Sequence, residues 1–392
     1  MSDPILRIAA RGDGVSASGR HVPFAVPGDA IEDDGSLTEG PHHQVPPCRH
    51  FPECGGCQLQ HADDDAYRDY LISRVESALA QHDLSADIRP PHLSPPNSRR
   101  RASLRAMRGG QGAVIGFNAA RSHRIVDMRE CHILRPELFA LVAPLRGLLA
   151  ALLEPRRTVE IQLALADQGV DVLLKGVDAG NLAAIEQLTA FCADHGLARL
   201  SLDRGIGPET FYEPAPATVT LSGTPVALPV GAFLQATEDG EAALVATVQQ
   251  AVAGSPAIAD LFAGLGTFAL GLPGKVYAAE AARDAVLALK GAAPGIAVEH
   301  RDLYRRPLDA AELANFAAVV LDPPRAGAEE QVRALAGSTV ARVAYVSCNP
   351  ATFARDARIL SDGGYTLASV LPVGQFRWST HVELAAHFSR TN

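Results

Sequence analysis

The stretch DLFAGLGTFAL, residues 260–270, joins a short apolar run to a helix-like segment through a turn that contains two glycines. Gly264 and Gly266 lie in that turn, where a missing Cβ atom lets a ligand approach the backbone. The pattern is only G-x-G and lacks the third glycine of the dinucleotide fingerprint, so alone it is a weak signal. It indicates the first strand-to-helix turn of a nucleotide-binding domain.

Short apolar runs alternate with helix-like segments from about residue 237 to the end of the sequence. The strand-like runs are AIADLF, VYAAE, IAVEH, AAVVLDPP and ARVAYVS, at residues 257–262, 276–280, 296–300, 317–324 and 341–347. This alternation is typical of a parallel, doubly wound sheet, whose ligands bind at the carboxyl ends of the strands. We therefore predict a Rossmann-like α/β domain over residues 237–392.

Acidic residues lie at or just after the strand-like part of three of these runs. Glu280 ends VYAAE and Asp302 follows IAVEH, and a carboxylate at such a strand end can accept hydrogen bonds from ribose hydroxyls. Because a third glycine and a P-loop lysine are both lacking, we predict an adenosine-bearing ligand without a pyrophosphate. The alternative is that these acids cap helix N-termini. Two prolines after Asp322 make a stiff corner, which would hold Asp322 and Arg325 over the cleft.

The segment YVSCNP, residues 345–350, places Cys348 between an apolar run and a proline that opens a helix-like stretch. A thiol at a helix N-terminus can have a lowered pKa and become reactive. The alternative is a buried thiol that only packs, which is common for free cysteine. Position alone does not decide between these readings.

The first 236 residues have a different pattern. Residues 1–40 contain short strand-like pieces separated by Gly- and Ser-rich turns, which suggests a small barrel. Beyond them we predict one amphipathic helix at 64–82, short strands at 113–118 and 123–128, hairpins at 158–176 and 217–230, and a helix at 181–196. We accordingly expect a mostly β central region over 41–236.

Composition and charge exclude some classes. The chain has 392 residues, 47% of them hydrophobic, and a net charge of −9, which argues against a nucleic-acid coat protein. No signal peptide or membrane span is evident, so we expect a cytoplasmic protein that does not bind membranes, and a monomer. A local basic cluster indicates either a solvated surface or an anionic partner. Its members are Arg99, Arg100, Arg101, Arg105, Arg108, Arg121, Arg124 and Arg129.

Four of the six cysteines have a spacing that suggests a metal site. Cys48, Cys54 and Cys57 form C-x5-C-x2-C, and Cys131 lies farther along the chain. Four thiols suit zinc or an iron–sulfur cluster, and His50 and His61 keep zinc as an alternative. Cys192 lies in a helical pattern and is expected to be part of a core.

Taken together, these motifs resemble the S-adenosylmethionine-dependent RNA 5-methyluridine methyltransferases over nearly the whole chain. DLFAGLGTFAL looks like their cofactor loop, GAFLQAT like a cofactor-contacting segment, and CRHFPECGGCQLQH like their cluster segment. LDPPRAG, YVSCNPATFARD and HVE, at 381–383, are similar to their late motifs and occur in the same order. The start, RIAARGDGVSASGR, is similar to a TRAM-like (OB-type) barrel.

The resemblance implies a class I methyltransferase domain at 237–392, an iron–sulfur and RNA-binding region at 41–236 and a TRAM-like segment at 1–40. It implies Cys348 as nucleophile, Glu383 as base, and a [4Fe–4S] cluster on Cys48, Cys54, Cys57 and Cys131. It implies these residues as contacts of S-adenosylmethionine: Gln235, Phe262, Glu280, Asp322, and also Asp302 and Thr267. The chain departs from the family at Thr237 and Thr267, where many members have asparagine, and both threonines can still form hydrogen bonds.

The chemistry needs such a pair of residues. Uracil C5 is a poor nucleophile until a thiolate adds to C6, and a base must then remove the C5 proton so that the thiol can leave. The predicted substrate is RNA, with 23S rRNA preferred to tRNA. The rivals are a tRNA uridine-C5 methyltransferase, an RNA cytosine-C5 methyltransferase, whose cysteine would follow the fourth strand, and a non-catalytic iron–sulfur RNA-binding protein.

Overall fold

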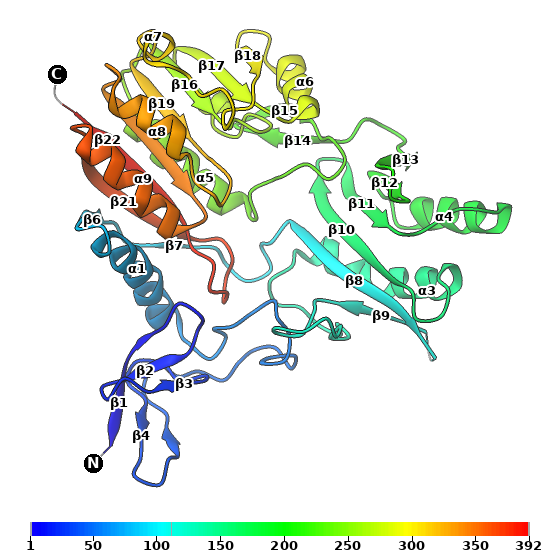
Figure 1. Ribbon diagram of the computed structural model, residues 1–392. Coiled ribbons are helices and arrows are strands. Elements are labelled where there is room, and N and C mark those ends of the chain that lie inside the picture. Colours follow the sequence, from blue (N-terminus) through cyan, green and yellow to red (C-terminus); the bar gives the residue numbers. More distant parts are fainter. Residues whose placement is uncertain (1, 111, 391–392) are drawn as a thin grey trace.

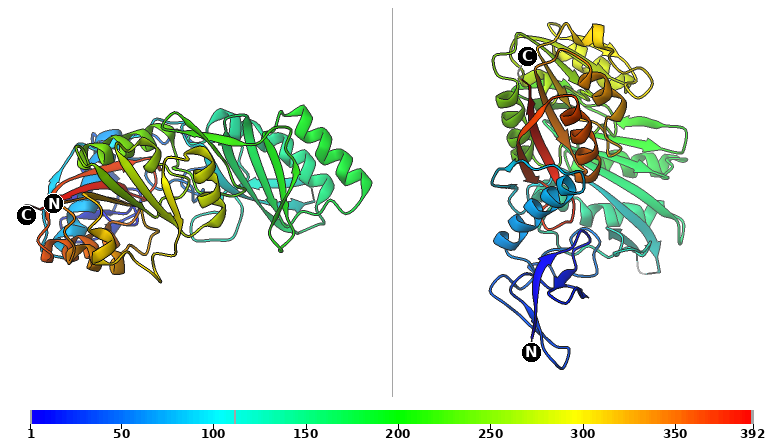
Figure 2. Two further views of the ribbon diagram at one scale, coloured as in Figure 1. Left: turned by 90° about the horizontal axis from the view of Figure 1, so that it is seen from above. Right: turned by 60° about the vertical axis from the view of Figure 1, so that its left-hand side comes forward.

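The computed structural model describes residues 2–110 and 112–390, which form three larger sheets and a two-stranded hairpin, with their covering helices (Figure 1). The first sheet is small and antiparallel, with strand order β3-β2-β1-β4-β5. Its strands are β1 (Asp3–Ile8), β2 (Gly14–Ser16), β3 (His21–Val22), β4 (Ala30–Ile31) and β5 (Leu37–Thr38). This sheet projects from the rest of the molecule (Figure 2).

The central sheet has six strands in the order β13-β12-β11-β10-β8-β9. Its strands are β8 (Arg101–Gly109), β9 (Gly112–Gly116), β10 (Thr158–Ala166), β11 (Gly169–Lys175), β12 (Arg199–Asp203) and β13 (Pro208–Tyr212). Helices α2 (Pro136–Ala140), α3 (Val142–Leu152) and α4 (Leu182–Asp194) accompany it, and β14 (Thr218–Leu221) and β15 (Thr224–Ala227) form a separate hairpin. Both predicted hairpins and the helix that ends before Gly196 are confirmed.

The expected strand at 123–128 is wrong. Within this segment only Ile125 makes an isolated bridge, to Asn118. The segment nevertheless follows β9, because the amide of Met128 donates to the carbonyl of Ile115. A Cβ atom at Gly116 would lie 1.9 Å from the carbonyl oxygen of Val126, so glycine permits this close but irregular approach.

The largest sheet contains the predicted parallel strands in the order β18-β17-β16-β19-β20, followed by β22, β21 and β6, with β7 paired to β21. Its strands are β16 (Ala257–Leu261), β17 (Lys275–Glu280), β18 (Ala297–His300), β19 (Ala318–Leu321), β20 (Arg342–Ser347), β21 (Thr366–Gly374), β22 (Glu383–Ser389), β6 (Asp87–Ile88) and β7 (His92–Leu93). Because β22 runs antiparallel to β20, its first residue lies at the edge where β20 ends.

Helices cover both faces of this sheet (Figure 1). They are α5 (Glu238–Ala251), η1 (Ala269–Gly271), α6 (Arg283–Ala292), α7 (Ala310–Leu313), α8 (Glu329–Ala336) and α9 (Pro350–Asp362). Alternate strand residues face the two layers, as strand geometry requires: Tyr345 joins the core under α8 and α9, whereas Ala344 and Val346 join the core under α5. The predicted doubly wound arrangement is confirmed.

Helix α1 (Asp64–Ala80) confirms the predicted amphipathic helix. Asp63 caps it by accepting a hydrogen bond from the amide of Ala66. The six apolar or aromatic positions that the pattern predicts are all buried: Tyr67, Tyr70, Leu71, Val75, Ala78 and Leu79. They share one core with α8, α9 and the C-terminal sheet, and β6 and β7 extend that sheet. Residues 64–93 therefore pack with the C-terminal sheet, although they precede the central one. None of the helices in the described part of the chain is long and apolar enough to cross a membrane.

Candidate active site

Cys348 lies between β20 and α9, as predicted. The strand ends at Ser347, whose hydroxyl accepts a hydrogen bond from the amide of Asn349 at 3.1 Å. The side chain of Asn349 in turn caps α9 by accepting from the amide of Ala351, and Pro350 occupies the first helical position, where its missing N–H costs no hydrogen bond. This local chemistry fixes the half-buried thiol at the carboxyl edge of the sheet.

The loop after β19 is held beside this turn by α9. The carbonyl of Arg325 accepts hydrogen bonds from the Asn349 side-chain amide at 3.0 Å and from the Thr352 hydroxyl at 3.1 Å. The Arg355 guanidinium donates to the carbonyl of Ala326 at 3.0 Å. The loop that carries Asp322 therefore lies against the turn that carries Cys348, which agrees with the rigid corner expected from its prolines.

Glu383 reaches the same edge through strand pairing. It is the first residue of β22, and the register pairs Leu384 with Ser347 and Glu383 with Val373. Glu383 is therefore next to the residue opposite the end of β20, beside Cys348, although 34 positions separate the two in the sequence. Its side chain is buried, with 5% of the residue exposed.

Three ionisable groups share this edge and perturb one another. Burial, and then the neighbouring Glu383, raise the pKa of the Cys348 thiol to about 11. Burial, and then Asp322, raise the pKa of Glu383 to about 8. Burial, and then Glu280, raise the pKa of Asp322 to about 7. A cluster of buried acids with raised pKa values is typical of functional sites. Such a cluster also favours binding of a positively charged group.

One expectation about Cys348 is corrected by this environment. The position before a helix suggested a lowered thiol pKa, but the pKa in the unliganded protein is raised. The helix N-terminus contributes a fraction of a charge, whereas burial and two nearby carboxyls all disfavour the thiolate. The thiol therefore stays protonated at neutral pH until another charge enters the site.

Gln235, the first residue of the expected cofactor set, lies in the same cluster and is 2% exposed. Its side-chain nitrogen is 3.5 Å from an oxygen of Asp322, and its side-chain oxygen accepts a hydrogen bond of 2.8 Å from the side chain of Gln375. Gln375 carried no sequence signal, because it lies in the irregular segment between β21 and β22. The structure thus brings together Cys348, Glu383, Asp322 and Gln235, and adds Gln375.

The glycine turn after β16 carries the expected residue Phe262 and is tied to Glu280, the last residue of β17. Phe262 has a positive φ of 65°, and its ring centroid lies 5.5 Å from that of Tyr304. The two carboxylate oxygens of Glu280 accept hydrogen bonds from the amides of Gly264, at 3.0 Å, and Ala282, at 2.6 Å. Glu280 therefore ties the turn to the end of β17, and each oxygen retains a lone pair for a further donor.

The two glycines of the turn have different roles. Gly264 has φ +55°, and a Cβ atom there would meet nothing within 4 Å, as expected where a ligand approaches the backbone. The expectation is corrected for Gly266, because a Cβ atom there would lie 2.5 Å from Leu289 of α6. Gly266 therefore serves helix packing. Thr267 is half-buried in this turn, and Asp302, beyond β18, accepts a hydrogen bond from the amide of Tyr304.

The basic cluster is only partly a surface. Arg100 is 3% exposed, and its guanidinium pairs with Glu241 of α5 at 2.5 Å and donates to the carbonyl of Gln235 at 3.1 Å. Arg100 is therefore corrected from a surface cation to a buried connection between β8 and the segment of Gln235. Arg99 and Arg101 flank it, with guanidinium carbons 5.1 Å from the ring centroid of Phe376 and 4.5 Å from that of Phe233.

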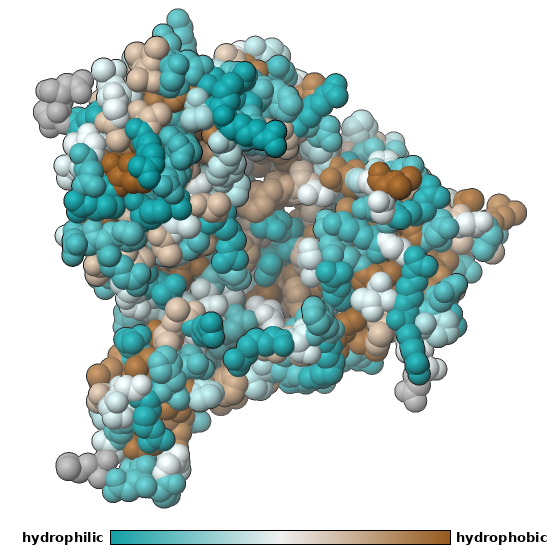
Figure 3. Space-filling model, in the orientation of Figure 1, coloured by the Kyte–Doolittle hydropathy of each residue, from teal (hydrophilic) through white to brown (hydrophobic). Residues whose placement is uncertain are grey.

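The hollow face between the C-terminal and central sheets is visible in Figure 3. Arg101 begins β8, and its positive charge acts on Glu383, so the start of this strand is near the catalytic candidates. Phe233 is 62% exposed, which leaves an aromatic face open to solvent beside Arg101. Arginines and exposed aromatic rings are the side chains that contact phosphates and stack with unpaired bases.

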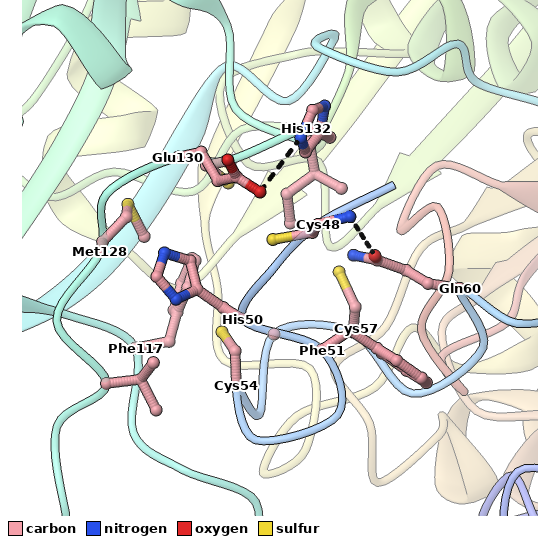
Figure 4. Close-up of a pocket in the computed structure, with 14 residues that line it drawn as sticks. Cys48, His50, Phe51, Cys54, Cys57, Gln60, Phe117, Met128, Glu130 and His132 are labelled. Carbon is pink, nitrogen blue, oxygen red and sulfur yellow. Dashed lines mark hydrogen bonds and ion pairs between the residues drawn. The ribbon is translucent and has the colours of Figure 1, made fainter. Parts of the chain in front are cut away.

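A second site surrounds the four cysteines expected to bind metal. Cys48, Cys54, Cys57 and Cys131 all line one cavity, together with apolar side chains that include Phe117 and Met128 (Figure 4). Burial is the main cause that raises the pKa of each of these thiols, to about 12 for Cys57. A metal that binds here must displace these protons.

The sulfur atoms of the four cysteines do not form a tight group. Tetrahedral zinc with bonds of about 2.3 Å would bring its sulfur ligands to within about 4 Å of one another. Among the described residues, no three of these sulfur atoms lie within 4.8 Å of one another. Four thiols around an apolar cavity are a donor set that suits either zinc or an iron–sulfur cluster.

The two histidines that kept zinc as an alternative differ from each other in position: one lines the cavity and the other does not. His50 lines the cavity, but its Nε2 accepts a hydrogen bond from the amide of Arg129. His61 is buried among the rings of Phe24, His43 and Phe51, and it does not line the cavity. Cys192 is fully buried in the core of the central sheet, as predicted.

The family model described as tRNA (Uracil-5-)-methyltransferase matches residues 295–391. An uncharacterized RNA methyltransferase of Zymomonas mobilis is 51% identical over 98% of this chain and 99% of its own. The 23S rRNA (uracil(1939)-C(5))-methyltransferase RlmD of Bordetella parapertussis is 31% identical over 88% of this chain and 80% of its own.

The fold has a close counterpart among solved structures. The Pyrococcus abyssi tRNA (uracil-54, C5)-methyltransferase, determined with S-adenosyl-L-homocysteine, superposes with a TM-score of 0.73 over 99% of this chain and 100% of its own, at 23% identity. The fold is thus that of the class I methyltransferases, with a preceding β-rich part, as predicted. The chain belongs to the RNA (uracil-5-) methyltransferase family and is an enzyme of that type.

Proposed function

We propose that this enzyme transfers a methyl group from S-adenosylmethionine to C5 of a uridine in RNA, through a covalent bond between Cys348 and C6. The observation that carries the proposal is the convergence of Cys348, Glu383 and Asp322 at one edge of the sheet. The reaction needs a thiol and a carboxylate side by side, and it needs a donor whose positive charge suits a site of buried acids.

Each residue has a distinct role in this scheme. Cys348 first gives up its proton to solvent, and the thiolate sulfur then bonds to C6. The C5–C6 π electrons shift through C4 onto the exocyclic oxygen O4, so that the resulting enolate is nucleophilic at C5. C5 takes the methyl group of S-adenosylmethionine, whose sulfonium sulfur keeps the electron pair of the broken S–CH3 bond and leaves as S-adenosylhomocysteine. Glu383 then removes the C5 proton, the C5–C6 double bond re-forms, and the bond between sulfur and C6 breaks. Because the pKa of Glu383 is raised to about 8, this carboxyl is poised to exchange a proton near neutral pH.

The donor would bind along the ends of β16, β17 and β19. We propose that Gln235, Phe262, Glu280 and Asp322 contact it, with Asp302 and Thr267 at the margin. Gly264 supports this placement, since its open Cβ direction leaves the backbone accessible. The raised pKa of Asp322 supports it as well, because a cation beside this carboxyl would restore its charged form.

We propose that Cys48, Cys54, Cys57 and Cys131 hold a [4Fe–4S] cluster with a structural or RNA-positioning role. The four thiols around one apolar cavity support this assignment. We favour 23S rRNA as the substrate, since RlmD, whose name states that substrate, is 31% identical to this chain. A tRNA substrate is the second candidate, because the matching family model is described by tRNA.

The test is methyl transfer from labelled S-adenosylmethionine to RNA from a strain that lacks the gene, with rRNA and tRNA assayed separately. The label should enter rRNA as 5-methyluridine, and Cys348→Ala should transfer none. Transfer to tRNA alone would overturn the substrate choice, whereas 5-methylcytidine as the product, or transfer by Cys348→Ala, would overturn the reaction.

A further inference from the structure

Gln375 is a buried polar residue that the scheme above leaves without a role. It directly follows the last residue of β21, close to the point where the register pairs Val373 with Glu383, and it is 2% exposed. Helix α5 makes room for it: a Cβ atom at Gly240 would lie 2.8 Å from the Cβ of Gln375. A glycine inside a helix normally costs stability, so this close approach is a specific feature of the site.

The hydrogen bonds of Gln375 fix the direction of its amide. The backbone N–H of Ala236 can only donate, and it lies 2.9 Å from the side-chain oxygen of Gln375. The NH2 group must therefore face the other way. It donates to the side-chain oxygen of Gln235 at 2.8 Å. It also lies close enough to Glu383 to lower the pKa of that carboxyl, against the larger effect of burial.

The direction of the second amide follows from the first. Since the oxygen of Gln235 accepts from Gln375, the NH2 group of Gln235 must face Asp322, whose nearer oxygen is 3.5 Å away. The buried amide of Gln375 thus sets the orientation of the Gln235 side chain near the proposed cofactor site. It also places an NH2 group near the carboxyl of Glu383, the proposed base. Both neighbours lie at the edge of the sheet where Cys348 is found.

We propose that Gln375 is a positioning residue, which orients Gln235 toward the methyl donor and stabilises the carboxylate form of Glu383. This inference rests on the function proposed above, and it adds the residue that couples cofactor binding to proton removal. A donor to a carboxylate stabilises its charged form, so that loss of the donor raises the pKa of Glu383. The base is then ionised only at higher pH, and proton removal needs a more alkaline solution.

The test variant is Gln375→Met, which keeps the size of the side chain and removes both polar atoms. A matched control is Gln331→Met: Gln331 is 1% exposed and also makes two hydrogen bonds, to the amide and carbonyl of Leu308 in the same domain. If Gln375 serves only folding, the two variants should behave alike. Gly240→Ala is a second variant that keeps the Gln375 amide and displaces it.

Two readouts separate positioning from stability. In 13C NMR of protein labelled at the glutamate carboxyls, the Glu383 resonance, assigned by its loss in Glu383→Gln, should titrate about one pH unit higher in Gln375→Met, as expected for the loss of one charged hydrogen bond. Binding of S-adenosylhomocysteine, measured by calorimetry, should weaken about tenfold, as expected for one misdirected amide. Gly240→Ala should change the Glu383 midpoint and the affinity for S-adenosylhomocysteine in the same directions as Gln375→Met, but to a smaller extent.

Unchanged values in Gln375→Met, or equal shifts in Gln331→Met, would overturn the inference. The titration uses protein without RNA or methyl donor. An enzyme that proved unable to methylate uridine would therefore refute the proposed function, while the midpoint of Glu383 would still decide the role of Gln375. In the methylation assay, Gln375→Met should also move the acidic limb of the pH profile to higher pH, a change that a smaller fraction of folded protein cannot produce.

Discussion

The buried pair of Arg100 and Glu241 gives a prediction with a defined magnitude. In Arg100→Met the carboxylate of Glu241 loses a partner at 2.5 Å, and the carbonyl of Gln235 loses a donor at 3.1 Å. The side chains of Arg100 and Glu241 are only 3% and 11% exposed, so water does not replace the guanidinium. Removal of one partner from such a pair costs about 3–5 kcal/mol, most of it the penalty of an uncompensated buried charge.

The assay is urea unfolding followed by the fluorescence of Trp378, the single tryptophan of the chain, which is 5% exposed and belongs to the core of the central sheet. The free energy of unfolding should fall by about 3–5 kcal/mol in Arg100→Met. The loss should be smaller at pH 5 than at pH 8. Burial already raises the pKa of Glu241. Without Arg100, folded Arg100→Met keeps a proton on Glu241 that the unfolded chain releases. The free energy of unfolding of this variant therefore decreases as the pH rises.

The double variant Arg100→Met with Glu241→Met is the control. With both charges replaced by apolar groups, most of the lost stability should return. A loss below about 1 kcal/mol in the single variant, the size expected of an exposed pair, would contradict the reasoning. So would a double variant whose RNA affinity has a flatter salt dependence, because that would assign Arg100 to the RNA phosphates after all.

Three further predictions concern the other features. Protein purified without oxygen should contain iron and sulfide in near-equal amounts, and the variant Cys54→Ser should lose both. The control variant Cys192→Ser, at a buried thiol outside the cavity, should keep them. Zinc without iron in the purified protein would refute the cluster. Arg101→Glu should weaken RNA binding and flatten its salt dependence, whereas Arg204→Glu, on the distant β12–β13 turn, should do neither; equal effects would argue against an RNA surface at β8. The rate of alkylation of Cys348 by iodoacetamide in the free protein should rise steeply only toward pH 11. At pH 8, S-adenosylmethionine, a cation, should accelerate alkylation more than S-adenosylhomocysteine does. A rate that reaches its midpoint near pH 7 without ligand would refute the claim that nearby carboxyls and burial keep the thiol protonated.

Much of the fold could be predicted because it depends on local patterns. The alternation of apolar runs and helices after residue 237 fixes a parallel sheet, and the turn residues fix two hairpins. The position of Cys348 at a strand end follows from the same pattern, since a proline marks the start of α9. The strand expected at 123–128 failed because apolar alternation does not show whether a segment has a regular partner.

The geometry of the site depends on contacts between distant residues. The proximity of Glu383 to Cys348 results from the antiparallel insertion of β22 beside β20, and no local pattern in the sequence encodes that pairing. The burial of Arg100 depends on Glu241, 141 positions away. Gly266 looked like a ligand-binding glycine, and only its distance to α6 reveals a packing role. Gln375 lies in an irregular segment, where neither periodicity nor composition distinguishes a positioning amide from a loop residue.

The most direct test of the central claim is the species that Glu383→Gln accumulates with RNA and labelled S-adenosylmethionine. If Cys348 forms the adduct and Glu383 removes the C5 proton, this variant should add to C6 and accept the methyl group, and then stall. It should yield a protein–RNA complex that survives denaturing electrophoresis and carries the labelled methyl, and the complex should be absent when Cys348→Ala is combined with it. Normal turnover by Glu383→Gln without a trapped complex, or a complex that persists in the double variant, would contradict the assignment of these two residues.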